Sequence, residues 1–132
     1  MIGLDTNVLV RIFVSEGGDD EARARAFLAE RSAPGAFFVP TIVLVELVWT
    51  LRSRYRFSRS AVSEVLSSLL DSDDFVVEHR SFVEEALRRE VSNAADFADM
   101  MIAECCLAAG CERTFTLDEA AAKTIPSMDL VP

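Results

Sequence analysis

The fold is decided by the stretch Ile2-Gly3-Leu4-Asp5-Thr6-Asn7-Val8-Leu9, in which a short apolar run ends at an acidic residue. The run Ile2–Leu4 predicts a short buried strand, and Thr6–Val14 predicts a helix that opens directly after it. Asp5 therefore lies at the carboxyl end of the predicted strand. The same arrangement returns late in the chain, where Asp118 directly follows the run Thr114–Leu117.

Short apolar runs and longer helical patterns alternate along the whole chain. The patterns predict strands at Ile2–Leu4, Ala36–Val39, Phe75–Glu78, Thr114–Leu117 and Met128–Val131, and helices at Thr6–Val14, Asp19–Ser32, Thr41–Tyr55, Ser58–Leu70, Ser81–Val91, Asp96–Ala109 and Glu119–Thr124. Such alternation is typical of a parallel sheet covered by helices on both faces. We therefore expect a single α/β domain over residues 1–132, with Thr41 and Ser58 or Ser60 as helix N-caps and Gly110 in the C′ position.

The composition is that of a soluble globular protein, with 51% hydrophobic and 27% charged residues. No apolar run reaches the roughly 18 residues that a membrane span needs. The first residues show no secretory signal, and the odd number of cysteines is typical of reduced, buried thiols. We expect a cytoplasmic protein without a membrane partner.

The net charge of −9 argues against a general nucleic-acid binder, because phosphate contacts need Lys and Arg. A polyanionic substrate would have to be drawn by metal ions and by a local basic patch. One candidate patch, interleaved with Tyr55 and Phe57, consists of Arg52, Arg54, Arg56 and Arg59. Such a segment could bind phosphates and stack bases, or it could be a solvated helix end.

The two strand-end acids, Asp5 and Asp118, have two interpretations. In open parallel sheets, ligands bind beyond the carboxyl ends of the strands, so both side chains would point to one crevice. Asp is also a good helix N-cap, and each of the two precedes a predicted helix. The sequence leaves both interpretations open for either residue alone.

Glu46 stands in the segment Ile42–Trp49, which is apolar all round and therefore predicts a buried helix. A lone buried carboxylate costs several kcal/mol unless it is paired or bound to a metal. Glu46 is therefore a candidate metal ligand, and the alternative is a salt bridge with an arginine such as Arg11.

Asp99 shares a helix face with Ile102, Ala103 and Cys106, so it points from an apolar face at the first turn of its helix. The alternative is a capping pair, with Asp96 as the N-cap and Asp99 three residues later. Asp96 is the fifth acid of the region, and we expect it to act as a cap.

Four carboxylates without a His or Cys partner indicate a hard cation, because all-oxygen ligation suits Mg²⁺ and Mn²⁺ whereas zinc prefers nitrogen or sulfur. The lone histidine, His79, follows the third predicted strand, where we expect an ordinary strand-end residue. Neither a nucleophile elbow nor a phosphate-binding P-loop is present.

The ordered motifs resemble those of PIN-domain ribonucleases over essentially the whole chain. Four segments carry the resemblance, namely residues 1–9, Val45–Leu47, Asp96–Ala103 and Thr114–Asp118. The length resembles that of the VapC-type toxins of bacterial toxin–antitoxin pairs.

The resemblance implies a three-layer α/β/α fold around a central parallel five-stranded sheet, and Mg²⁺- or Mn²⁺-dependent endonucleolytic cleavage of RNA. It places Asp5, Glu46, Asp99 and Asp118 in the acidic site. Asn7 and Thr116 match polar positions that would orient the carboxylates or water. The implied partners are an RNA substrate, a cognate VapB-type antitoxin and a second copy in a homodimer.

Three other functions fit parts of the pattern. A haloacid-dehalogenase-like phosphohydrolase would have a second acid two residues after Asp5, where this chain has Asn7. A response-regulator receiver would have a late strand-end lysine, whereas Lys123 lies within the last predicted helix. A catalytically silent, regulatory PIN domain keeps the fold, but the presence of all four acids counts against it.

Overall fold

The computed structural model describes residues 1–89 and 94–132, together with the side chains of all of these except residues 94–96. The strands are short and parallel, as the α/β prediction requires: β1 (Ile2–Gly3), β2 (Phe37–Val39), β3 (Phe75–Val77), β4 (Thr114–Thr116) and β5 (Met128–Leu130). They form two sheets, one of order β1-β2-β3 and one of β4 with β5. The predicted single five-stranded sheet is therefore not what the described residues form.

The helices lie close to the ranges predicted from apolar periodicity. They are α1 (Thr6–Phe13), α2 (Asp19–Arg31), α3 (Thr41–Ser53), α4 (Arg59–Asp71), α5 (Arg80–Arg88), α6 (Ala94–Ala108) and α7 (Glu119–Thr124). None of these helices is long and apolar enough to cross a membrane, as far as the chain is described.

Two predicted helix caps are confirmed and one is wrong. Ser58 caps α4, because its hydroxyl accepts a hydrogen bond from the Ala61 N–H at 3.1 Å. Gly110, with φ of +93°, occupies the C′ position of α6. Thr41 is not an N-cap but the first residue of α3, and its N–H donates to the Glu78 carboxylate at 2.8 Å. A side chain from the end of β3 thus replaces the local cap that the sequence predicted.

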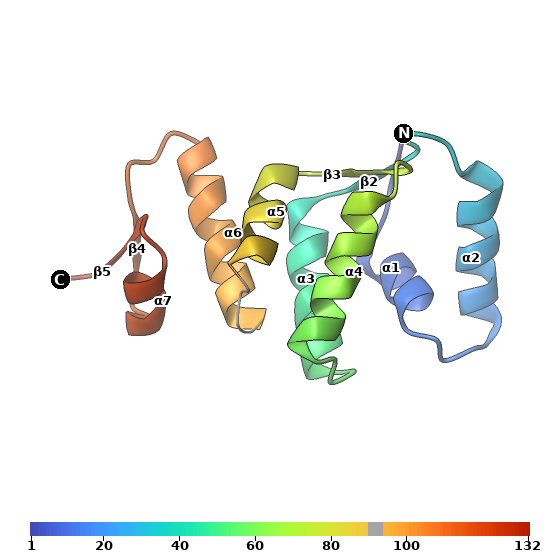
Figure 1. Ribbon diagram of the computed structural model, residues 1–132, viewed down its shortest axis with the longest axis horizontal. Helices are drawn as coiled ribbons and strands as arrows, with labels where there is room; N and C mark the ends of the chain where they lie inside the picture. Colours follow the sequence, from blue (N-terminus) through green and yellow to red (C-terminus); the bar gives the residue numbers. More distant parts are fainter. Residues whose placement is uncertain (90–93) are drawn as a thin grey trace.

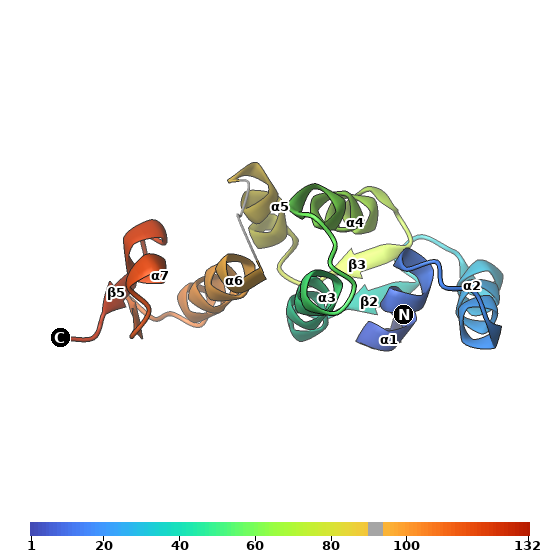
Figure 2. The ribbon, with the colours of Figure 1, turned by 90° about the horizontal axis from the view of Figure 1, so that it is seen from below.

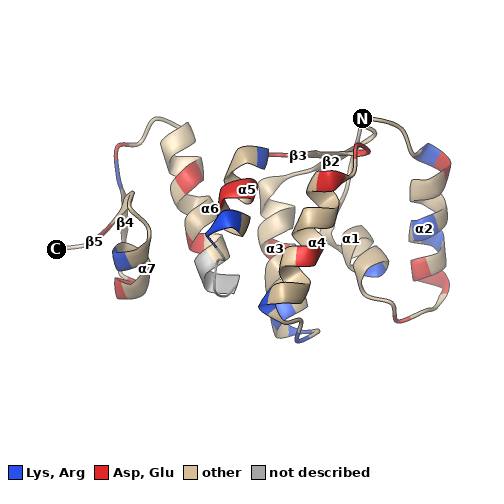
Figure 3. Ribbon diagram, in the orientation of Figure 1, with Lys and Arg blue, Asp and Glu red and all other residues tan. Residues whose placement is uncertain are grey.

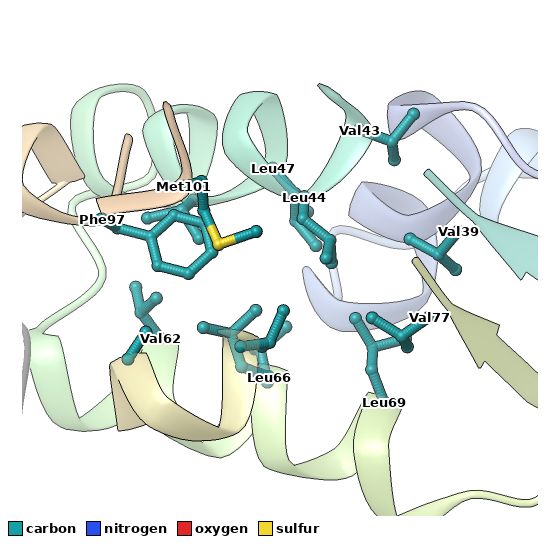
Figure 4. Packing of buried hydrophobic residues seen from close by; sticks show 14 of the residues in the cluster. Val39, Val43, Leu44, Leu47, Val62, Leu66, Leu69, Val77, Phe97 and Met101 are labelled. Atoms are coloured by element: carbon teal, nitrogen blue, oxygen red, sulfur yellow. The ribbon is translucent and has the colours of Figure 1, made fainter. Parts of the chain in front are cut away.

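The largest core lies where α3, α4 and α6 meet beside the β1-β2-β3 sheet. Leu44 and Leu47 of α3 are fully buried, and Figure 4 shows them opposite Leu66 and Leu69 of α4. Phe97 and Met101 extend the cluster from α6, which packs along α3 and α5. This packing fixes α6 against the body of the molecule.

Beyond α6, the elements β4, α7 and β5 form what we call the C-terminal unit, residues 113–132. It lies at the far end of an elongated molecule, with α6 between it and the other sheet (Figures 1 and 2). Its extensive contacts within the described chain are among its own elements. Ala121, Ile125 and Met128 are buried there, and Arg113 donates to Asp129 at 2.6 Å across the β4-β5 pair. The segment Thr114–Asp118, which ends in an acidic residue, therefore lies far from β1 within one chain (Figures 1 and 2).

Candidate active site

Asp5 lies two residues beyond β1, after Leu4, at the carboxyl end of the sheet where the sequence placed it. Its Oδ1 accepts a hydrogen bond from the Thr6 N–H at 2.8 Å, so it caps α1. The carboxylate is nevertheless exposed. Capping and ligand binding are therefore compatible for this residue, because capping uses one oxygen of an accessible group.

Thr6 connects the first two acids of the site. Its backbone N–H donates to Asp5, and its hydroxyl donates to Glu46 Oε2 at 3.1 Å. Thr6 is 3% exposed, and its position in the packing of α1 against α3 is fixed. Thr6 thus contacts two carboxylates near the end of β1, that of Asp5 through its backbone N–H and that of Glu46 through its buried hydroxyl. Sequence reasoning missed Thr6, and its only signal was a hydroxyl residue between an acid and an apolar helix.

Glu46 is exposed, and the prediction that it lies buried inside an apolar helix is wrong. On α3, Leu44 and Leu47 face the core, whereas Ile42 and Trp49 are 75% and 62% exposed on the Glu46 side. The apolar residues around Glu46 are therefore an uncovered face and not a second core. The proposed salt bridge with Arg11 is not formed either, because Arg11 lies beside Glu16 and Asp20.

Asp99 is half-buried on α6, between the buried Phe97 and Met100. Because α6 packs along α3, the two helices that carry Asp99 and Glu46 are neighbours. Asp96, predicted as the N-cap of this helix, lies outside the residues whose side chains the structure describes.

Asp118 lies at the end of β4 and caps α7, with Oδ1 accepting from the N–H groups of Ala120 and Ala121 at 2.8 and 3.0 Å. The Thr116 hydroxyl accepts a hydrogen bond from the Asp118 N–H at 3.0 Å, so this contact is to the backbone of Asp118 and not to its carboxylate. Both side chains belong to the C-terminal unit. Asp118 therefore does not lie beside β1 of the same chain.

The expected metal pocket is only partly assembled in this arrangement of the chain. The described residues contain no group of three or more His, Cys, Asp or Glu side chains that could hold a metal ion. The oxygen donors at Asp5 and Glu46 have the right chemistry for Mg²⁺ or Mn²⁺. The ligand number is incomplete in the described chain, because Asp118 is on the C-terminal unit and Asp5, Glu46 and Asp99 do not form such a group by themselves.

Basic side chains gather at the turn between α3 and α4. Arg54, Arg56 and Arg59 are exposed and have no acidic partner within the described chain, whereas Arg52 donates to the Phe57 carbonyl at 2.6 Å and stabilises the turn. Figure 3 shows this basic end where α3 meets α4. Arg54 lies about 12 Å along the helix axis from Glu46.

A groove of about 720 Å³ lies between α1 and α2. It is lined by Asn7, Arg11 and Arg23 among others, and the charges of the two arginines are balanced by Asp20 and Glu30. Asn7, which is exposed, follows Asp5 and Thr6 in the chain. The groove therefore begins near the acidic end of β1 but is not itself a basic surface.

Cys105 offers no competing chemistry. Burial raises the pKa of the Cys105 thiol, and the nearby Glu78 raises it further. A thiol with a raised pKa stays protonated near neutral pH and is a poor nucleophile and metal ligand.

The chain matches the PIN domain family over residues 2–125. It belongs to the PIN-domain family. This PIN domain is also similar to the VapC ribonuclease of Aquifex aeolicus (strain VF5), with 32% identity over 99 residues that cover 74% of this chain and 73% of that protein. No solved structure matches it. The resemblance to VapC-type PIN domains that the four motifs predicted is confirmed.

Proposed function

We propose that this PIN domain is a Mg²⁺- or Mn²⁺-dependent endoribonuclease and the toxin of a type II toxin–antitoxin pair. The observation that carries the proposal is the Asp5–Thr6–Glu46 arrangement, in which Thr6 donates to two exposed carboxylates, to Asp5 through its backbone N–H and to Glu46 through its buried hydroxyl group. Membership of the family and the VapC ribonuclease relative support RNA as the substrate.

The catalytic set would be Asp5, Glu46, Asp99 and Asp118, which would bind the cation. A bound divalent cation supplies charge stabilisation for the phosphate and lowers the pKa of a bound water. The protein's part is to position the acids: the Thr6 hydroxyl would orient Glu46, and the N–H groups of Ala120 and Ala121 would orient Asp118. Asn7, exposed beside Asp5, would contact water or the phosphate.

Hydrolysis by water forms one P–O bond and breaks the bond to the 3′-oxygen, which takes up a proton. The products are then a 5′-phosphate and a 3′-hydroxyl. Attack by the RNA's own 2′-hydroxyl would leave a 2′,3′-cyclic phosphate instead. To test the proposal, total RNA is incubated with the protein and the ends of the fragments are analysed. Cyclic phosphate ends, or no cleavage at all, would contradict it, and the latter would favour a catalytically silent PIN domain.

The partners follow from the same family. We propose that the chain acts as a single domain in the cytoplasm, binds a VapB-type antitoxin and forms a homodimer. The exposed apolar residues Ile42 and Trp49, beside Glu46, would suit an antitoxin segment that covers the site.

Thr6→Val is expected to lower the rate of RNA cleavage about 10- to 100-fold, the usual effect of removing a group that orients a metal ligand. The variant loses the hydroxyl that donates to Glu46 but keeps the shape of the buried side chain. The initial rate is measured as a function of Mn²⁺ concentration, with Thr6→Ser as the control that keeps the hydroxyl. If Thr6→Val were as active as Thr6→Ser, the Thr6 hydroxyl would have no role in the active site.

Arg54→Gln and Arg56→Gln are each expected to weaken RNA binding and to lower the slope of log affinity against log salt by about 0.7, the value for one phosphate contact on a single strand. The two side chains are exposed and form no salt bridge in the described chain, so RNA would be their first charged partner. Affinities are measured in an Asp5→Asn background, with Arg31→Gln as the control because Arg31 lies 3.6 Å from Glu30. Equal salt slopes for all variants would mean that this turn does not contact RNA.

A further inference from the structure

Among the described residues, no strand pairs with the outer edge of β1. The N–H groups of Ile2 and Leu4 donate to carbonyls of the β2 side, at 2.7 and 2.9 Å. Because successive residues of a strand face opposite edges, the backbone groups of Gly3 point away from β2. Gly3 is exposed, and a Cβ atom placed on it would meet nothing within 4 Å. The first sheet therefore ends in an open edge beside Asp5.

The outer edge of β4 is open in the same way. The Thr114 N–H donates to Ser127, and the Thr116 carbonyl accepts from Val131, both at 2.9 Å, so these two residues face β5. The backbone groups of Phe115 and Leu117 then point to the free edge. Their side chains are 60% and 82% exposed. In the described chain, β1 and β4 each have one edge without a neighbouring strand, so these two edges could pair with each other.

One register of pairing between β1 and β4 gives hydrogen-bond partners to the free backbone groups of both edges. If β1 and β4 pair in parallel with Gly3 opposite Thr116, the Gly3 N–H donates to the Phe115 carbonyl, and the Gly3 carbonyl accepts from the Leu117 N–H. Leu117 then lies beside the buried Leu4, and Asp118 lies beside Asp5 at the strand spacing of about 4.8 Å. A register shifted by two residues would also pair the backbone groups of both edges. It would, however, place Leu117 away from Leu4 and Asp118 away from Asp5.

The path of the chain separates the two edges within one molecule. At the end of α6, the Gly110 N–H donates to the Leu107 carbonyl and the Cys111 N–H to the Cys106 carbonyl, both at 2.9 Å. These two bonds form a Schellman cap, which fixes the direction in which the chain leaves the helix. Only residues 111–113 then lead to β4, on the far side of α6 from β1 (Figure 1). The chain is thus held in an open form, with both edges exposed.

We propose that two copies of this chain exchange their C-terminal units, so that β4 of each copy pairs with β1 of the other. Exchange of an identical element satisfies both edges without rearranging α6 or its cap, and it is a low-cost route to a dimer. Under the proposed function, on which this part of the inference rests, each acidic site takes Asp5, Glu46 and Asp99 from one chain and Asp118 from the other. The exchange would place Asp118 beside Asp5, where the ligand number within one described chain is incomplete.

A disulfide test of the exchange does not depend on enzymatic activity. In a chain with Cys105, Cys106 and Cys111 replaced by Ser, Gly3→Cys and Thr116→Cys are introduced together and oxidised. Exchange predicts a covalent dimer on a non-reducing denaturing gel, because strand neighbours lie within disulfide range. The control pairs Gly3→Cys with Lys123→Cys, which is outside the predicted pairing and should not crosslink. A crosslink within the monomer would overturn the proposal in favour of closure onto the same chain, and no crosslink would overturn the register.

A complementation test uses the native cysteines. The variants Asp5→Asn and Asp118→Asn are unfolded, mixed in equal amounts and refolded together. Half of the exchanged dimers then combine the two variants, and each has one intact site, so about a quarter of the wild-type cleavage rate should return. Asp5→Asn mixed with Glu46→Gln is the control, because both lesions precede the exchanged unit and no intact site can form. Activity in the first mixture but not in the second supports exchange, and no activity in either overturns it, provided that the wild type cleaves RNA. An inactive wild type would contradict the proposed function instead. The disulfide test would then still show whether the C-terminal units are exchanged.

Discussion

Asp5→Asn is expected to lower the rate of RNA cleavage about 100- to 1,000-fold, the effect of removing one preorganised charge-stabilising group from an active site. The same change is expected to alter the free energy of unfolding by less than about 1 kcal/mol, because Asn and Asp are equally good N-caps. Asp5 both caps α1 and presents an exposed carboxylate, so the two readouts separate its two roles. Initial cleavage rates and urea unfolding measure them.

Asp19→Asn is the matched control for this variant. Asp19 is also an exposed aspartate in the first turn of a helix, at the start of α2. The control should cleave RNA at close to the wild-type rate. If Asp5→Asn retained full activity, Asp5 would be a helix cap alone, and if it unfolded the protein, the loss of activity would say nothing about chemistry.

Leu47→Ala is expected to lower the free energy of unfolding by about 2–5 kcal/mol, because it leaves a cavity in a packed core. Leu47 is 0% exposed on α3 and lies where α3, α4 and α6 meet (Figure 4). A domain of this size has a total stability of about 5–15 kcal/mol, so the loss would be a large part of it. Urea unfolding followed by circular dichroism measures the change.

Leu107→Ala provides the comparison, since it makes the same substitution at a helical residue that is 41% exposed. Its loss of stability should be well under half of that of Leu47→Ala. Equal losses for the two variants would mean that the α3 core does not dominate folding.

The sequence predicted the elements well, because strand and helix periods are local properties. The helix from Thr6 and the helix from Asp19 each end one residue before the predicted end, and Gly110 ends α6 as expected. The family could also be recognised from the sequence, because its four motifs lie in order along the chain. In each case the signal lay within a few neighbouring residues.

The failures concern long-range packing. Glu46 is flanked by apolar residues on all sides in sequence, and no pattern shows that the side of α3 bearing Ile42 and Trp49 is uncovered in this arrangement. The separation of β4 from β1 arises from the cap at Gly110 and the packing of α6, which the alternation of strands and helices does not encode. Thr6 was missed because its role depends on a carboxylate forty residues away.

The central claim is that a divalent cation at these carboxylates is needed to cut RNA. The most direct test is incubation of the purified wild-type protein with total RNA and Mg²⁺ or Mn²⁺, with EDTA and then with Mn²⁺ restored in excess. We expect discrete fragments that disappear with EDTA and return with the metal. Cleavage that continues unchanged in EDTA would contradict the claim.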